Sequence, residues 1–197
     1  MTGVVAYASM TGLLPPPHEL DLAICFTDMR GFTALSEETE PNRLFALVSA
    51  LLAEQVNLIH EYGGYVDKFG GDGVMAIFDG PDMILQCCLC ALSIMDIAHI
   101  KHSADLEEIR RFRIGINTGR AVIGNIGSPE HLDYSAIGST VNLAARLCGQ
   151  AEPTSIAVSS AVRDAVGSDK RLKFHSEREV AIHGIRGPVT VYTLSRP

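Results

Sequence analysis

The chain has 197 residues, of which 47% are hydrophobic and 20% are charged, an ordinary balance for one globular domain with a hydrophobic core. Its formal net charge of −7 argues against a nucleic-acid-binding surface, because such a surface needs a basic face. Nucleic acid is therefore not an expected partner. An acidic chain can still bind an anionic small molecule where metal ions and a few basic groups gather locally.

Five cysteines lie within apolar runs of the sequence: Cys25, Cys87, Cys88, Cys90 and Cys148. An odd number of cysteines in apolar surroundings predicts buried free thiols, which are typical of a reducing compartment. The N-terminus does not show the basic segment and apolar core of a secretory signal. We therefore expect a cytoplasmic location, either for this chain alone or for the cytosolic domain of a larger or membrane-attached protein.

Residues 1–19 form a predicted N-terminal arm or linker, and residues 20–197 form a single predicted domain. The arm has weak hydrophobic periodicity and ends in three prolines, Pro15, Pro16 and Pro17. Consecutive prolines resist both a helix and the hydrogen-bonded ladder of a sheet. Such a composition is typical of a linker.

Strands and helices alternate through the rest of the chain. A buried strand at 22–26 precedes a helix with apolar positions between 44 and 59, for which Thr39 or Asn42 is the expected cap. The next expected elements are strands at 65–69 and 74–78, a helix at Met83–Ile100, and strands at 112–117 and 121–126 about a turn at 118–120. A helix capped by Ser139 or Thr140 follows, then a strand at 155–158, a helix at 159–166 and a closing hairpin with strands at 180–182 and 189–194. This order predicts an α+β fold, a ferredoxin-like βαββαβ sandwich with additional C-terminal strands and a helix.

Two aspartates stand at the ends of predicted strands, each beside glycine. Asp28 follows the first strand, and Asp72 lies in the glycine-rich turn 70–73 that joins the strands of a tight hairpin. If these strands are neighbours, the two carboxylates meet at one end of the sheet and need a cation between them. Hard oxygen ligands beside a phosphate suit Mg²⁺ or Mn²⁺. Either aspartate alone is explained equally well by turn chemistry.

The segment 133–147 predicts a strand end, a glycine turn and a helix that carries Asn142 and Arg146. Residues four apart lie on one face of a helix, so the amide and the guanidinium are side by side. This pair is suited to hold ribose and phosphate oxygens. The alternative is a solvated helix face, the usual position of an isolated asparagine and arginine.

Four segments together resemble the class III nucleotidyl cyclases, the family that includes the adenylyl and guanylyl cyclases. They are FTDMRGFT at 26–33, DKFGGDGVMAIF at 67–78, RIGINTGRAVIGNIG at 113–127 and YSAIGSTVNLAARL at 134–147. These segments occur in the order and at the spacing of that family, and the resemblance runs from about residue 20 to residue 194. It implies the same α+β architecture.

The resemblance implies conversion of ATP to 3′,5′-cyclic AMP and pyrophosphate, as the output domain of a signal-transduction protein. By it, two Mg²⁺ or Mn²⁺ ions per site are held by Asp28, Asp72 and the carbonyl of Met29 and assist attack of the ribose 3′-hydroxyl on the α-phosphate. Asn142 and Arg146 are the catalytic pair that orients the ribose and stabilises the transition state. Further substrate-binding positions are the purine-selecting Lys68 and Ser135, the phosphate-wrapping Met29, Arg30, Gly31, Phe32 and Thr33, and the phosphate-contacting Arg120.

One position departs from the family pattern. His183 stands where many members have a lysine that contacts the triphosphate, and a neutral imidazole is a weaker phosphate ligand. Arg186, three residues later, is the expected compensating cation. We assign His183 to the substrate-binding set on the resemblance alone.

The choice of purine follows from donors and acceptors. Lys68 only donates, which suits the N1 acceptor of adenine, and Ser135 can accept from the exocyclic amino group. Guanine presents N1–H to Lys68, an unfavourable donor–donor contact, so ATP is the favoured substrate. The alternatives are a guanylyl cyclase, a diguanylate cyclase on a related fold, and a catalytically weak regulatory domain.

The resemblance also implies a head-to-tail homodimer with two active sites at its interface. The metal aspartates belong to one chain of each site, and Lys68, Asn142 and Arg146 to the other. Because a two-fold axis brings each half-site to its complement, both sites of such a dimer are equivalent.

Overall fold

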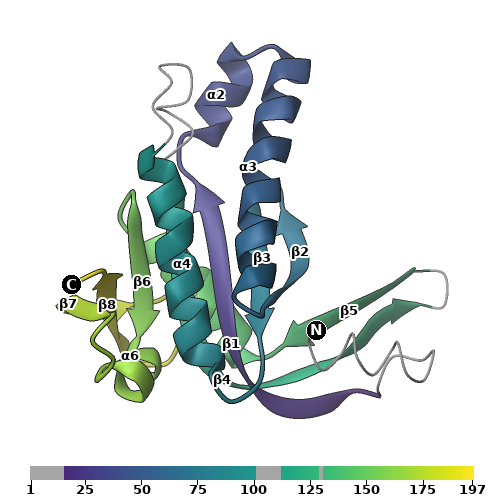
Figure 1. Ribbon diagram of the computed structural model, residues 1–197. Coiled ribbons are helices and arrows are strands. Elements are labelled where there is room, and N and C mark those ends of the chain that lie inside the picture. The colour runs from purple at the N-terminus through teal and green to yellow at the C-terminus, as the bar shows by residue number, and fades with distance from the viewer. Residues whose placement is uncertain (1–15, 101–111, 129–130) are drawn as a thin grey trace.

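The computed structural model describes residues 16–100, 112–128 and 131–197, which form a layered α+β domain (Figure 1). The strands are β1 (His18–Met29), β2 (Tyr65–Gly70), β3 (Gly73–Phe78), β4 (Phe112–Ser128), β5 (His131–Ile137), β6 (Ser155–Ser159), β7 (Lys173–Ala181) and β8 (Pro188–Ser195). The helices are α2 (Phe32–Glu38), α3 (Pro41–Glu61), α4 (Met83–Ile100), α5 (Ser139–Gln150) and α6 (Ser160–Val166).

The strands form one mixed sheet in the order β2-β3-β1-β4-β6-β8-β7, and β5 pairs with β4 away from this path. β4 and β6 are parallel, whereas β1 is antiparallel to both β3 and β4. The quartet β2-β3-β1-β4, with α3 and α4 as its connections, has the ferredoxin-like arrangement that the sequence predicts. The remaining strands extend the sheet beyond β4, which confirms the α+β fold with its C-terminal additions.

The centre of the sheet is covered on both faces, which explains why the middle of β1, residues 22–26, is an unbroken apolar run. Helices α3 and α4 lie side by side across one face (Figure 1). Ala23 and Cys25 pack toward that layer, while Leu22 and Ile24 alternate to the other face and join the cluster that contains Val141 of α5. The period-two alternation of strand side chains produces this division. The site-bearing helix α5 therefore packs on the face opposite α3 and α4.

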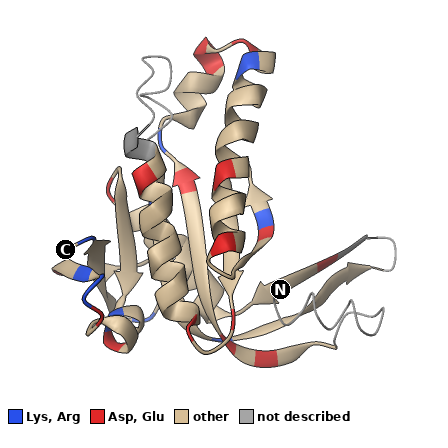
Figure 2. Cartoon of the chain, viewed as in Figure 1, with Lys and Arg blue, Asp and Glu red and all other residues tan. Residues whose placement is uncertain are grey.

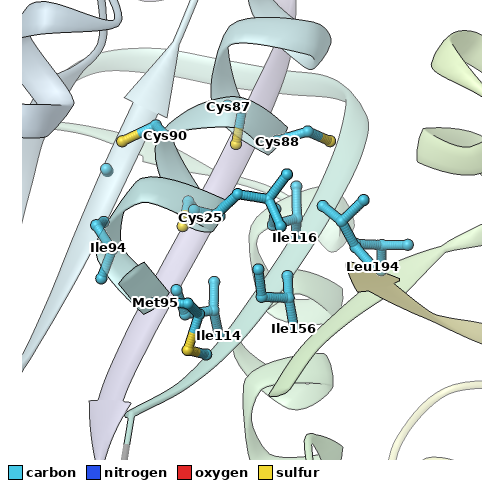
Figure 3. Close-up of a cluster of buried hydrophobic side chains, with 14 of the residues drawn as sticks. Cys25, Cys87, Cys88, Cys90, Ile94, Met95, Ile114, Ile116, Ile156 and Leu194 are labelled. Atoms are coloured by element: carbon cyan, nitrogen blue, oxygen red, sulfur yellow. The ribbon is translucent and has the colours of Figure 1, made fainter. Parts of the chain in front are cut away.

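The cysteines are core residues, as predicted. Cys87, Cys88 and Cys90 on α4 gather with Cys25 of β1 among isoleucine and leucine side chains (Figure 3). All five cysteines are buried and free, and burial raises the pKa of the Cys148 thiol to about 12. Burial also raises the pKa of the Cys87, Cys88 and Cys90 thiols, so these three and Cys148 stay protonated at neutral pH. All five cysteines pack as small hydrophobic groups.

Charged residues are sparse along α4 and the central strands and are more frequent at the ends of the elements (Figure 2). By length and composition alone, α3 is apolar enough to cross a membrane. Leu47, Leu51 and Ile59 of this helix, however, pack in the core layer beneath it. A covering helix of the sheet needs such an apolar face.

The predicted turn at residues 118–120 is wrong, because β4 continues straight through it. Thr118, Gly119 and Arg120 all pair with β1, opposite Ala23, Leu22 and Asp21. The ladder holds the backbone extended, and Gly119 adopts a φ of +148° within it. β1 itself begins at His18, so the last two residues of the predicted arm belong to the sheet; residues 1–15 lie outside the described part.

The expected helix caps also differ from the structure. Glu40 caps α3, where its carboxylate accepts from the backbone N–H of Arg43 at 3.1 Å. Gly138 is the cap residue of α5 and provides no side-chain bond, while the Thr140 hydroxyl donates instead to the carbonyl of Arg120 at 2.6 Å. The additional helix α2 and the longer β7 were not predicted. β7 is an edge strand with several charged side chains, so its sequence lacks the alternation of apolar residues by which a strand is predicted.

Candidate active site

The two predicted metal-binding aspartates lie together at one end of the sheet. Asp28 is near the end of β1, and Asp72 is in the two-residue turn between β2 and β3. The backbone N–H of Met29 donates to Oδ2 of Asp72 at 3.3 Å, which ties the two segments together. Gly73 permits this approach, because a Cβ at that position would collide with the carbonyl oxygen of Thr27. The placement of Asp28 beside Asp72 therefore follows from β1–β3 pairing and from one required glycine.

The electrostatics of this pair favour a cation. Burial raises the pKa of Asp72, and the nearby charge of Asp28 raises it further. Arg113, at the start of β4, donates from Nε to Oδ2 of Asp28 at 2.5 Å. A positive group therefore already neutralises one member of the carboxylate pair. The sequence reasoning missed Arg113, which stands directly opposite Asp28 in the β1–β4 register.

These groups fit the divalent metal ions that the resemblance implies. Two carboxylates, with the Met29 carbonyl as the expected third donor, form a hard-oxygen set. Among the described residues, no cluster of three or more histidine, cysteine, aspartate or glutamate side chains gathers at one point. Because Mg²⁺ is commonly held by one or two carboxylates and substrate phosphates, a pair of aspartates is a sufficient protein contribution.

A cavity of about 250 Å³ adjoins Asp28. Its lining includes Lys68 of β2, Arg113 of β4, and Ala145 and Cys148 of α5. Within one chain, Lys68 lines the same cavity as Asp28, and the assignment of Lys68 to the partner's half of each site stays a prediction. The short hairpin that joins β2 to Asp72 accounts for this proximity.

The predicted purine-selecting residues Lys68 and Ser135 are brought together by Asp67. Ser135 Oγ donates to Asp67 Oδ2 at 2.7 Å, and Lys68 Nζ lies 3.3 Å from the same oxygen. β2 and β5 are not neighbours in the sheet, so this contact joins two strands that the hydrogen-bonded ladder leaves apart. The sequence reasoning did not single out Asp67.

Asn142 and Arg146 lie on α5 and line a second, larger cavity of about 530 Å³. The turn at Gly184 lies against Arg146, since a Cβ there would be 3.1 Å from both terminal guanidinium nitrogens. Arg186 also lines this cavity. The predicted amide–guanidinium face is therefore open to a hollow on the surface, and a second arginine stands beside it.

The position of α5 is set by two features of β4. Gly115 lets the helix approach closely, because a Cβ there would collide with the backbone of Ala144 and Cys148. The buried Asn117 donates from Nδ2 to the carbonyl of Thr140 at 3.0 Å and so anchors the first turn of α5. These contacts hold Asn142 and Arg146 on a rigid element.

The remaining predicted substrate-binding positions have less direct placements. Arg120 has a 74% exposed side chain that pairs with Glu19 at 3.4 Å, outside both cavities. His183 is exposed and is not among the residues that line the second cavity. Of the predicted phosphate-wrapping residues, Arg30 and Gly31 form the turn after β1, and Phe32 and Thr33 begin α2. Gly31 has a φ of +84° as the residue that precedes this helix.

Comparison with known proteins identifies the family. Residues 15–196 match the adenylate and guanylate cyclase catalytic domain. Adenylate cyclase 1 of Rhizobium meliloti (strain 1021) is 34% identical over 152 residues, which is 72% of this chain and 23% of that protein. The adenylate cyclase of Anabaena cylindrica is 34% identical over 134 residues, which is 65% of this chain and 27% of that protein.

Solved structures of both cyclase types share the fold. The adenylyl cyclase CyaB from P. aeruginosa superposes with a TM-score of 0.85 at 28% identity, over 93% of this chain and 97% of that one. The guanylyl cyclase Cya2 superposes with a TM-score of 0.85 at 27% identity, over 93% of this chain and 96% of that one. The chain therefore belongs to the class III adenylyl and guanylyl cyclase catalytic domains. It spans about a quarter of the length of the two curated relatives.

Proposed function

We propose that this domain is an adenylyl cyclase that converts ATP to 3′,5′-cyclic AMP and pyrophosphate. The observation that carries the choice of adenine is the Lys68–Asp67–Ser135 group. It places a side chain that only donates beside a hydroxyl that can accept. Adenine offers N1 as an acceptor and its amino group as a donor, so both contacts are satisfied. Guanine reverses both polarities.

The reaction is an intramolecular attack of the ribose 3′-hydroxyl on the α-phosphorus, with pyrophosphate as the leaving group. Asn142 orients the ribose, and Arg146 neutralises charge that develops on the α-phosphoryl oxygens. Two Mg²⁺ or Mn²⁺ ions at Asp28, Met29 and Asp72 would supply charge neutralisation for the 3′-hydroxyl and the triphosphate. The backbone of Met29 to Thr33 surrounds the β- and γ-phosphates, and Arg120 and His183 are assigned to the same phosphates. Positioning and electrostatics are the main contributions of the protein to phosphoryl transfer.

We place each complete site between two copies of the chain. Support comes from the separate cavities, because Asp28 lines one and the Asn142–Arg146 pair lines the other. Further support comes from two exposed apolar side chains on the strands that carry the predicted purine-selecting residues. Phe69 follows Lys68 in β2, Ile137 lies two residues after Ser135 in β5, and their exposures are 55% and 57%. Large exposed apolar residues beside a half-site favour burial against a second copy.

The proposed setting is the cytoplasm, with residues 1–19 as the connection to an upstream regulatory domain. The relatives support this arrangement because they are several times longer than the matching segment. The buried free thiols also agree with a reducing compartment.

The direct test is product identification by mass spectrometry after incubation with Mn²⁺ and either ATP or GTP. The proposal predicts cyclic AMP from ATP at a rate well above that of cyclic GMP from GTP. Dominant cyclic GMP formation would identify a guanylyl cyclase, an outcome that the equal likeness to Cya2 makes worth measuring. Absence of both products, with a folded and dimeric protein, would identify a regulatory cyclase-like domain.

A further inference from the structure

Asp67 sits at the point where β2 departs from regular pairing. Val66 pairs with Ala76 and Lys68 pairs with Met75, so Asp67 is the extra residue of a β-bulge. A bulge changes the direction of side chains locally and is common beside active sites. In a regular strand, Asp67 and Lys68 would face opposite sides of the sheet. Here their charged groups lie 3.3 Å apart.

We propose that Asp67 is a positioning residue that makes Ser135 an acceptor toward the purine and thereby sets the preference for adenine. This inference rests on the proposed function, in which Lys68 and Ser135 contact the base. Asp67 itself is not expected to touch the base and acts through its contacts with these two residues. Its side chain is 0% exposed, whereas that of Lys68 is 54% exposed.

The hydrogen bond from Ser135 determines the polarity of its hydroxyl. A serine hydroxyl has one hydrogen and two lone pairs, and it can present either to a ligand. Ser135 is 2% exposed, and its hydrogen is directed to Asp67 Oδ2 at 2.7 Å. Only lone pairs remain for the base. They match the amino group of adenine and repel the O6 carbonyl of guanine or hypoxanthine.

The environment of Asp67 keeps this arrangement in place. A buried carboxylate is stable only when it is paired and hydrogen-bonded, so loss of either bond to Oδ2 is costly. Oδ1 is buried and has no hydrogen-bond partner among the described residues, so both interactions fall on Oδ2. Asp67 therefore holds the Ser135 hydrogen and the Lys68 ammonium group at one oxygen. As a result, Lys68 is available to the base as a hydrogen-bond donor and Ser135 as an acceptor.

The test compares ATP with ITP, whose base carries N1–H and O6 in place of N1 and the amino group. The protein variants are Asp67→Leu, which removes the acceptor, Asp67→Asn, which retains an acceptor oxygen, and Ser135→Ala. Each is measured by kcat/KM for the two nucleotides and by their competition against a fluorescent ATP analogue in a binding assay. Melting scans check folding, and Asp67→Ala replaces the leucine variant if leucine prevents folding.

We expect Asp67→Leu to reduce the ATP-over-ITP preference roughly tenfold, the factor that one ordinary hydrogen bond supplies. Asp67→Asn should keep most of the preference. In a Ser135→Ala background, Asp67→Leu should change the preference by no more than about twofold, because Asp67 acts through the serine. If Asp67 had only a general structural role, Asp67→Leu would reduce kcat/KM for ATP and for ITP equally. The effect would also be the same with or without the Ser135 hydroxyl.

Two outcomes overturn the inference in distinguishable ways. If Ser135→Ala changes the preference but Asp67→Leu does not, Asp67 has no role in polarity and the proposed function stands. If Ser135→Ala leaves the ATP-over-ITP preference unchanged in both turnover and binding, Ser135 does not contact the base. The proposed recognition of adenine by Ser135 is then wrong, and so is the proposed role of Asp67.

Discussion

Arg113 and Asp28 form an ion pair between β4 and β1, in which the guanidinium Nε donates to Oδ2 of the carboxylate at 2.5 Å. The side chains are 21% and 31% exposed, so the pair is shielded from much of the solvent. Asp72 is close enough that the charge of Asp28 raises its pKa. The arginine thus neutralises one carboxylate of a pair that a metal ion would also neutralise.

This relationship predicts how Arg113→Gln responds to metal. In EDTA, the free energy of unfolding of the variant should be about 1 kcal/mol below that of the wild type, and its melting temperature roughly 2–4 °C lower, because the carboxylates lose their positive neighbour. Mn²⁺ should raise its melting temperature more than that of the wild type, since arginine no longer competes for Asp28. Calorimetric scans at several Mn²⁺ concentrations measure both effects. Arg171→Gln, which breaks an exposed pair with Asp169, is the control and should show no metal dependence of its own. An equal Mn²⁺ response in wild type and Arg113→Gln would contradict the competition.

The aspartate pair predicts a severe loss of turnover without loss of the fold. Asp28→Ala and Asp72→Ala should each lower the rate at saturating Mn²⁺ at least about a hundredfold, because each removes a hard ligand and a fixed charge. Asp28→Asn tests the charge with the shape nearly unchanged. Rates come from cyclic nucleotide formation, and circular dichroism checks the fold. Activity within tenfold of wild type in either alanine variant would remove these residues from the metal site.

Gly73 provides a prediction about stability. Gly73→Ala should lower the free energy of unfolding by about 2 kcal/mol or more, because the new methyl group collides with the Thr27 carbonyl and pushes β3 from β1. Gly70→Ala, on the same hairpin, is the matched control. A Cβ there meets no atom of the described residues within 4 Å, so the free energy of unfolding should change by no more than about 0.5 kcal/mol. Chemical denaturation measures both values. Similar stabilities of the two variants would mean that the close approach at Gly73 is not required.

The motifs identified the parts of the site that lie within one segment. Asp28 at a strand exit, Asp72 in a hairpin turn and Asn142 four residues before Arg146 are all local patterns, and each occupies the expected element. Contacts that depend on strand register could not be predicted from the sequence. Arg113 is 85 residues from Asp28, and Ser135 is 68 residues from Asp67, so neither pairing has a local signal.

The main error in the fold has a related cause. Glycine between two apolar runs indicates a turn, and residues 118–120 were assigned to one on that basis. The partner strand decides otherwise, because β1 is long enough to pair with all of 112–123. Glycine in a long strand can also mark a bend or a close approach, and the sequence alone does not distinguish these cases.

The most direct test of the account is complementation between two inactive chains. Asp28→Ala damages one half-site and Arg146→Ala the other, so in a mixed dimer one site carries both lesions and its twin carries none. The two variants are co-expressed with different tags, and heterodimers are purified through both. A heterodimer of Asp28→Ala with Asp72→Ala is the control, since each of its sites keeps one lesion and it should stay inactive. We predict that the Asp28→Ala/Arg146→Ala heterodimer makes cyclic AMP from ATP at up to about half the wild-type rate. A heterodimer as inactive as either parent homodimer would contradict a site shared between two chains.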